Sequence, residues 1–137
     1  TLLLWTLYSE RGCRGISPCP KRKMKTPNTP LFVKTHDFLL WLLRHTRRFP
    51  KNLRHSYTNR LETMGFDFQE AILMGNAVRG EQRSTWLGNA DGKLLCLRSL
   101  LRFALDLDLL SSQQLKYATQ YLSELGRLLG AWIKGTN

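Results

Sequence analysis

A chain of 137 residues is long enough for one domain with a hydrophobic core and too short for two comfortable ones. Its hydrophobic content of 42% does not predict disorder, and no apolar run approaches the ~20 residues that span a bilayer. The net charge of +11, from 21 basic and 10 acidic residues, predicts an anionic partner, most often nucleic acid.

The three cysteines, Cys13, Cys19 and Cys96, form an odd and sparse set, which argues against a disulfide framework. No Cys or His falls at zinc-ligand spacing, so we expect no metal and no cofactor. Cys96 lies in a leucine-rich run, where we expect a small buried apolar residue. This usage fits a reducing cytoplasm, and the apolar stretch 1–8 lacks the basic flank and cleavage site of a signal peptide.

Residues 1–29 hold three of the five prolines and a basic clump at 21–25, without periodicity. We interpret them as a flexible basic N-terminal arm that precedes a single domain at 30–137. Because "MKTPNTPLF" from Met24 resembles a natural start, our hypothesis is that residues 1–23 are an upstream extension or a sequence added during cloning.

Four helical segments follow the arm. The first is expected from about Pro30 to Arg48, with Thr29 as its N-cap and Pro50 closing it. The second is expected over 52–78, where apolar residues recur at steps of three and four.

A loop is predicted at 79–93, and the third helix then runs to Leu109. Ser111 and Gln114 form a capping-box pattern at the start of the fourth helix. Its apolar residues keep heptad spacing, which predicts nearly parallel or antiparallel neighbours. They are Leu115, Ala118, Leu122, Leu125, Leu129 and Trp132. The fold class is therefore all-α, an up-down-up-down four-helix bundle.

Two helices carry more apolar surface than one core requires. Six consecutive apolar residues at 38–43 cover the whole circumference of the first helix, and the third helix is apolar over about three quarters of its surface. The third helix is either the most buried element or packs a second face against other subunits. We favour a homo-oligomer.

The basic residues suggest a site for phosphate at the junction of the first two helices. The segment 44–54 contains Arg44, Arg47, Arg48, Lys51 and Arg54 and no acid. The first three suit a helix C-terminus, whereas the last two oppose the helix dipole at a helix start, so a ligand explains them better than folding does.

The third and fourth helices contribute further candidates. Arg98 and Arg102 lie on one narrow polar strip of the leucine-rich helix, which is either a solvated strip with an Arg102–Asp106 pair or a phosphate contact. The fourth helix adds Lys116, Arg127 and Lys134 on one side. The carboxylates are scattered along the chain, and the sequence contains no phosphate-binding loop, nucleophile elbow or metal-ligand spacing. We therefore expect no enzymatic activity.

Three segments resemble a known family. They are "FPKNLRHSYTNRLE" (49–62), "LRSLLRF" (97–103) and "SSQQLKYATQYLSELGRLLGAWI" (111–133). They are similar to the accessory variability determinant (Avd) proteins of bacterial and phage diversity-generating retroelements. The wider group includes four-helix-bundle proteins encoded within intervening sequences of ribosomal RNA genes.

The resemblance implies a basic four-helix bundle assembled as a homopentameric barrel, without catalytic activity of its own. Such a protein binds the template RNA or its cDNA and the element's reverse transcriptase, and supports mutagenic cDNA synthesis. Arg98, Arg102 and Arg127 match arginines of the family's motifs. The alternatives are an RNA-associated protein of the ribosomal intervening-sequence type, or a structural helical oligomer whose charge only maintains solubility.

Overall fold

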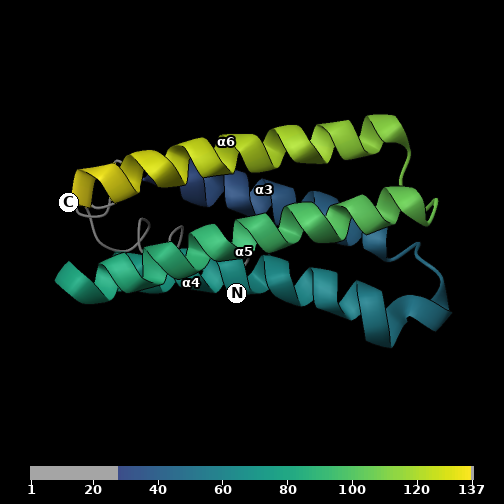
Figure 1. The fold of residues 1–137 in the computed structure, drawn as a ribbon, viewed down its shortest axis with the longest axis horizontal. Coiled ribbons are helices and arrows are strands. Elements are labelled where there is room, and N and C mark those ends of the chain that lie inside the picture. Colours follow the sequence, from purple (N-terminus) through teal and green to yellow (C-terminus); the bar gives the residue numbers. More distant parts are fainter. Residues whose placement is uncertain (1–27, 137) are drawn as a thin grey trace, which may run out of the picture.

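The computed structural model describes residues 28–136, which are helical without any strand (Figure 1). The main helices are α3 (Thr29–Thr46), α4 (Asn59–Ala77), α5 (Gly80–Asp106) and α6 (Ser112–Thr136). A short 3-10 helix, η1 (Lys51–Leu53), and a π-helix, η2 (Arg54–Thr58), connect α3 to α4. The predicted arm lies outside the described residues, except for its last two positions.

The four helices alternate in direction and close around one core, which confirms the predicted up-down-up-down bundle. α4 contacts α3 and α5, and α6 contacts α5 and α3, so each helix has two neighbours. No helix between residues 28 and 136 combines the length and apolar character that crossing a bilayer requires.

The first helix begins one residue earlier than predicted. Asn28 occupies the N-cap position and Thr29 is the first helical residue, so the expected Thr29 cap is wrong. Pro30 lies within the first turn, where its missing N–H costs no hydrogen bond. The helix ends at Thr46, and the chain passes through Pro50 before turning into η1.

The loop predicted at 79–93 is wrong, because α5 is continuous from Gly80. Leu87, Ala90 and Leu94 are fully buried, and their spacing of three and four extends the buried face of α5 by two turns. Gly88 and Gly92 each cost about 1 kcal/mol in a helix interior. Burial of Leu87, Ala90 and Leu94, where α5 packs against α4, offsets that cost.

The predicted heptad face and cap of α6 are confirmed. Five of its six heptad residues, Ala118 to Trp132, are buried, and Leu115 is half-buried. The Ser111 backbone N–H donates to Gln114 Oε1 at 2.9 Å, and the Gln114 N–H donates to Ser111 Oγ at 3.1 Å. This reciprocal capping box starts α6 at the predicted position.

α3 and α4 approach closely at a glycine. A Cβ atom at Gly65 would lie 2.7 Å from Leu39 Cδ2 and 3.5 Å from Leu42 Cδ2, both on α3. One and a half turns nearer the junction, the buried Thr46 hydroxyl donates to the Glu62 carboxylate across the same seam. These two contacts set the antiparallel register between α3 and α4.

Several apolar side chains remain at the surface. Cys96 is exposed, so the expectation that it is buried is wrong: it lies on the outer side of α5, away from Leu97. Leu95 and Phe103 of α5 are also exposed, as is Leu107 directly after it, so this helix is not wholly enclosed.

Substitution of the two glycines by alanine should have opposite effects. Gly65→Ala places a methyl group against the buried Leu39, and we expect a loss of about 1 kcal/mol in the free energy of unfolding, because overpacking exceeds the gain in helix propensity. Gly88→Ala meets open space and should gain up to about 1 kcal/mol. Urea denaturation measures both. A gain for Gly65→Ala would contradict the close approach.

The hydroxyl of Tyr57 should make stability pH-dependent in the alkaline range. Burial raises the pKa of Tyr57 to about 12, and its hydroxyl donates to the Leu100 carbonyl at 2.6 Å. Because the folded pKa exceeds the ordinary value of 10.0, this contribution is complete below pH 10 and is lost as pH rises toward 12.

Comparing wild type with Tyr57→Phe separates the effect of Tyr57 ionisation on stability from the effects of the other tyrosines and the lysines. Denaturation at a series of alkaline pH values should show the stability difference between the two proteins shrinking as pH rises. A constant difference would contradict the raised pKa.

Candidate nucleic-acid interface

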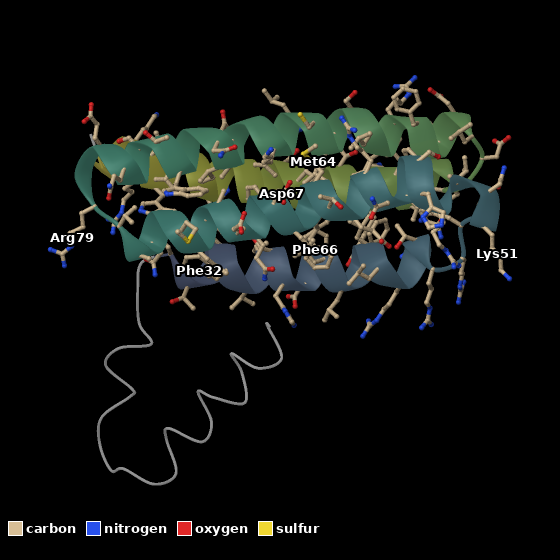
Figure 2. The ribbon with its side chains drawn as sticks, turned by 90° about the horizontal axis from the view of Figure 1, so that it is seen from below. Phe32, Lys51, Met64, Phe66, Asp67 and Arg79 are labelled. Atoms are coloured by element: carbon tan, nitrogen blue, oxygen red, sulfur yellow. The ribbon has the colours of Figure 1, made fainter. Side chains whose placement is uncertain are left out.

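The junction between α3 and α4 holds five basic side chains, which we call the end cluster. Its members are Arg44, Arg47, Arg48, Lys51 and Arg54, and all are exposed. They lie at one end of the bundle, where Figure 2 labels Lys51, whereas Arg79 is labelled at the opposite end. The structure thus brings together the five residues that were predicted as one group.

Hydrogen bonds and one buried ring hold this junction in a defined shape. The N–H groups of Arg48 and Phe49 donate to the carbonyls of His45 and Thr46, at 3.1 and 2.9 Å. The Phe49 ring is buried and stacks on Tyr57, with 6.3 Å between ring centroids. The end cluster therefore extends from an ordered backbone, which reduces the entropy lost when a ligand binds.

The wide π-helical turn places Arg54 at the start of the second helical segment. The backbone N–H of Asn59 donates to the Arg54 carbonyl, five residues earlier. Segments of π-helix are rare and frequently occur at functional sites. The sequence predicted an ordinary helix from residue 52, since a π turn leaves no distinct signature in residue type.

The end cluster is electrostatically uncompensated. Neither of the two ion pairs found among residues 28–136 involves any of its members. No acid lies in the first turn of η1 or η2, although the helix dipole favours one there. Bringing exposed, unpaired cations together is unfavourable without a counterion, so this end of the molecule favours an anion.

The other predicted residues lie along α5 and α6, and we call them the lateral set. Arg98 Nη2 donates to the Leu122 carbonyl at 3.3 Å, so this side chain crosses the seam onto α6. Gly126 lies beside it, and a Cβ atom there would be in ordinary van der Waals contact with the same Nη2, at 3.5 Å. Arg98 is therefore partly committed to joining the two helices.

Two further arginines of the lateral set have carboxylate partners. Arg102 Nε lies 3.6 Å from Asp106 Oδ1, with both side chains more than half exposed, so the pair predicted from sequence is present. Arg127 Nε donates to Glu124 at 3.2 Å, and this hydrogen bond lowers the pKa of the Glu124 carboxyl. Exposed pairs such as these contribute little to stability, but they reduce the positive potential around each arginine.

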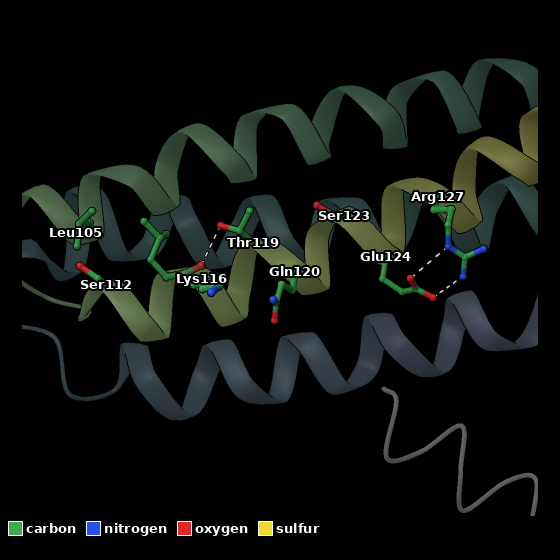
Figure 3. Close-up of a pocket in the computed structure, with 9 residues that line it drawn as sticks. Leu105, Ser112, Lys116, Thr119, Gln120, Ser123, Glu124 and Arg127 are labelled. Atoms are coloured by element: carbon green, nitrogen blue, oxygen red, sulfur yellow. Dashed lines mark hydrogen bonds and ion pairs between the residues drawn. The ribbon is translucent and has the colours of Figure 1, made fainter.

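The two lysines of the lateral set, Lys116 and Lys134, are exposed on the same side of α6 as Arg127. Lys116 and Arg127 line an open groove of about 600 Å³ along α6, together with Thr119, Gln120 and Ser123 (Figure 3). Glu124 also lines this groove and carries the opposing charge. The lateral set is therefore a weaker attractor of anions than the end cluster.

Sequence reasoning missed an aromatic array on the α3–α6 seam. Trp41 stacks on His45 at a centroid distance of 4.1 Å and lies 5.7 Å from Tyr117, which in turn contacts Tyr121 at 5.4 Å. The sequence already places Trp41 and His45, and likewise Tyr117 and Tyr121, four residues apart on one helix. It does not show that the two pairs meet, because their contact requires α6 to close the bundle against α3.

Comparison with known proteins identifies the family. A search among curated proteins found no match. A family model described as bAvd-like matches residues 31–136, which include nearly all of the four helices and every residue of the end cluster and the lateral set. The match confirms the resemblance to Avd proteins, and the chain belongs to the bAvd-like family.

Proposed function

We propose that the protein is a non-catalytic accessory factor of a diversity-generating retroelement. In this role it binds the template RNA or its cDNA together with the element's reverse transcriptase, and supports mutagenic cDNA synthesis. Membership of the bAvd-like family supports the class of function. The observation that carries nucleic-acid binding is the end cluster, with five exposed cations and no acidic partner among the described residues.

Phosphate is the anion that best fits this cluster. Arginine offers a planar fork of donors that matches phosphate oxygens, and four of the five residues are arginines. Cations that neutralise phosphates release condensed counterions, which gives affinity without sequence specificity. An accessory protein that must hold many different cDNA sequences needs this kind of contact.

We further propose that the protein acts as a homo-oligomer through the α3–α4 seam. The antiparallel register, in which Leu39 meets Gly65 and Thr46 meets Glu62, places Leu40 opposite Phe66 and Val33 opposite Leu73. These four side chains are 38% to 52% exposed. We call them the apolar stripe, and the position of Phe66 between the two helices is labelled in Figure 2.

A stripe of this kind is best explained by a second copy of the chain, because exposed contiguous apolar surface is rare on monomers. The same surface on every copy allows a closed ring if each subunit also offers a complementary face. The number of five subunits rests on the family resemblance.

A ribosomal intervening-sequence protein remains the second candidate, since that group shares the fold and basic character. The neighbouring genes discriminate between the two. A reverse transcriptase gene with a repeat pair beside the gene for this chain supports the retroelement role, and a ribosomal RNA gene around it supports the second candidate. The third candidate, a structural oligomer, fails if charge removal leaves the fold intact and abolishes RNA binding.

Removal of charge from the end cluster should weaken the salt dependence of RNA binding. For Arg47→Gln/Lys51→Gln/Arg54→Gln we expect the slope of log affinity against log salt to become shallower by about two units, at ~0.7 per lost contact with a single strand. Titration of a labelled RNA at several salt concentrations measures it.

Arg79→Gln is the control, because Arg79 lies at the opposite end of the bundle. Arg98→Gln/Arg102→Gln should change the slope less, since both arginines already have partners within the protein. If the salt slope changes by the same amount per removed charge in the end-cluster variant, in Arg79→Gln and in Arg98→Gln/Arg102→Gln, the end cluster is not the principal contact.

A charge on the apolar stripe should dissociate the oligomer. Phe66→Glu places a carboxylate at the centre of the proposed contact, and we expect light scattering to give the mass of a smaller species while circular dichroism stays helical. Leu95→Glu is the matched control, because Leu95 is 65% exposed on α5, away from the stripe. If Phe66→Glu keeps the wild-type mass, or if Leu95→Glu loses it equally, the assignment of the stripe is wrong.

A further inference from the structure

A pocket lies between the last turns of α3 and the start of α6, at the same end of the bundle as the end cluster. The pocket has a volume of about 500 Å³ and is lined by Trp41, Ser111, Gln113, Gln114 and Tyr117. The pocket is shallow and open to solvent, so a ligand can reach it from the surface. Two aromatic rings from different helices thus meet side-chain amides and a hydroxyl in one recess.

The aromatic wall offers surface to a planar ligand. Tyr117 is 48% exposed and Trp41 is half-buried, and their rings are tilted by 34° with centroids 5.7 Å apart. His45 stacks on Trp41, and its Nδ1 lies 2.7 Å from the Trp41 carbonyl oxygen. The indole is therefore held in place before any ligand arrives.

The amides provide hydrogen-bonding groups beside this wall. Gln114 Oε1 accepts the Ser111 N–H in the capping box, so the amide NH₂ of Gln114 is left to donate. The Gln113 side chain makes no hydrogen bond within the described part of the chain and offers both a donor and an acceptor. A nucleobase edge carries donors and acceptors of these kinds in its plane.

The charges next to the pocket fit a phosphate on one side of it. Arg44 follows Trp41 by three residues on the same side of α3, and Arg48 lies in the turn that follows the last residue of the helix. Asp37 lies one turn before Trp41, in the other direction. A phosphate is therefore attracted toward the end cluster and repelled from the Asp37 side.

We propose that this pocket binds an unpaired nucleobase of a single-stranded nucleic acid, while Arg44 and Arg48 hold the adjacent phosphates. The proposal rests on the proposed function and specifies that the bound nucleic acid is single-stranded. A duplex cannot use the pocket, because its base faces are stacked and their pairing edges are occupied. Stacking on an aromatic ring tolerates every base, as a template or cDNA of variable sequence requires.

The test compares two single-stranded oligonucleotides of equal length, one with normal bases and one with abasic residues, and a duplex of the same sequence. The proteins are wild type, Tyr117→Leu and Phe103→Leu. Tyr117→Leu keeps an apolar side chain and removes the ring. Phe103→Leu is matched to it, since Phe103 is 53% exposed on α5 and also contacts a tyrosine.

We expect Tyr117→Leu to weaken binding of the normal single strand by about 5- to 140-fold, the range of one base stacked on an aromatic ring. Binding of the abasic strand and the duplex should not change, and the salt slope should stay constant because no phosphate contact is lost. Phe103→Leu should have no effect on any of the three ligands.

An equal affinity of wild type and Tyr117→Leu for the normal strand overturns the base pocket, and so does an equal loss on the abasic strand. In both cases binding that depends on the end cluster would still support the proposed function. If wild type binds none of the three ligands, the proposed function itself is wrong.

Discussion

Burial of one apolar stripe from each of the four helices is the constraint on which the rest of the structure depends. Leu61, Leu97 and Leu122, from three different helices, have no exposed surface. Once these stripes face inward, the charged side chains must lie on the outside or at the ends. The same constraint sets the close contact at Gly65, because a larger residue would hold α3 away from α4.

The ends of the bundle differ in chemistry as a consequence. The α3–α4 junction must reverse the chain within a few residues, and it does so with exposed backbone and basic side chains. Along the sides, arginines find carboxylates three or four residues away on the same helix or a carbonyl on the next one. At the junction, no ion pair among residues 28–136 involves the five basic side chains, so their charges are not compensated by a neighbouring carboxylate.

Charge and aromatic surface have complementary roles in the proposed interface. Phosphate contacts give affinity that falls with salt, whereas stacking in the pocket gives affinity that depends on free bases. Their adjacency at one end of the molecule would let a single strand use both at once. The apolar stripe flanks the α3–α4 seam, whereas the pocket lies between α3 and α6.

The sequence by itself determined the number and class of the helices, the heptad face of α6 and its cap, because these depend on residues three or four apart. It also determined that the basic residues gather at 44–54. Tertiary structure alone decided where α5 begins, since burial of Leu87 and Ala90 against α4 overrides the local preference of two glycines. It also decided that Cys96 faces outward and that Trp41 meets Tyr117, because both depend on which helices become neighbours.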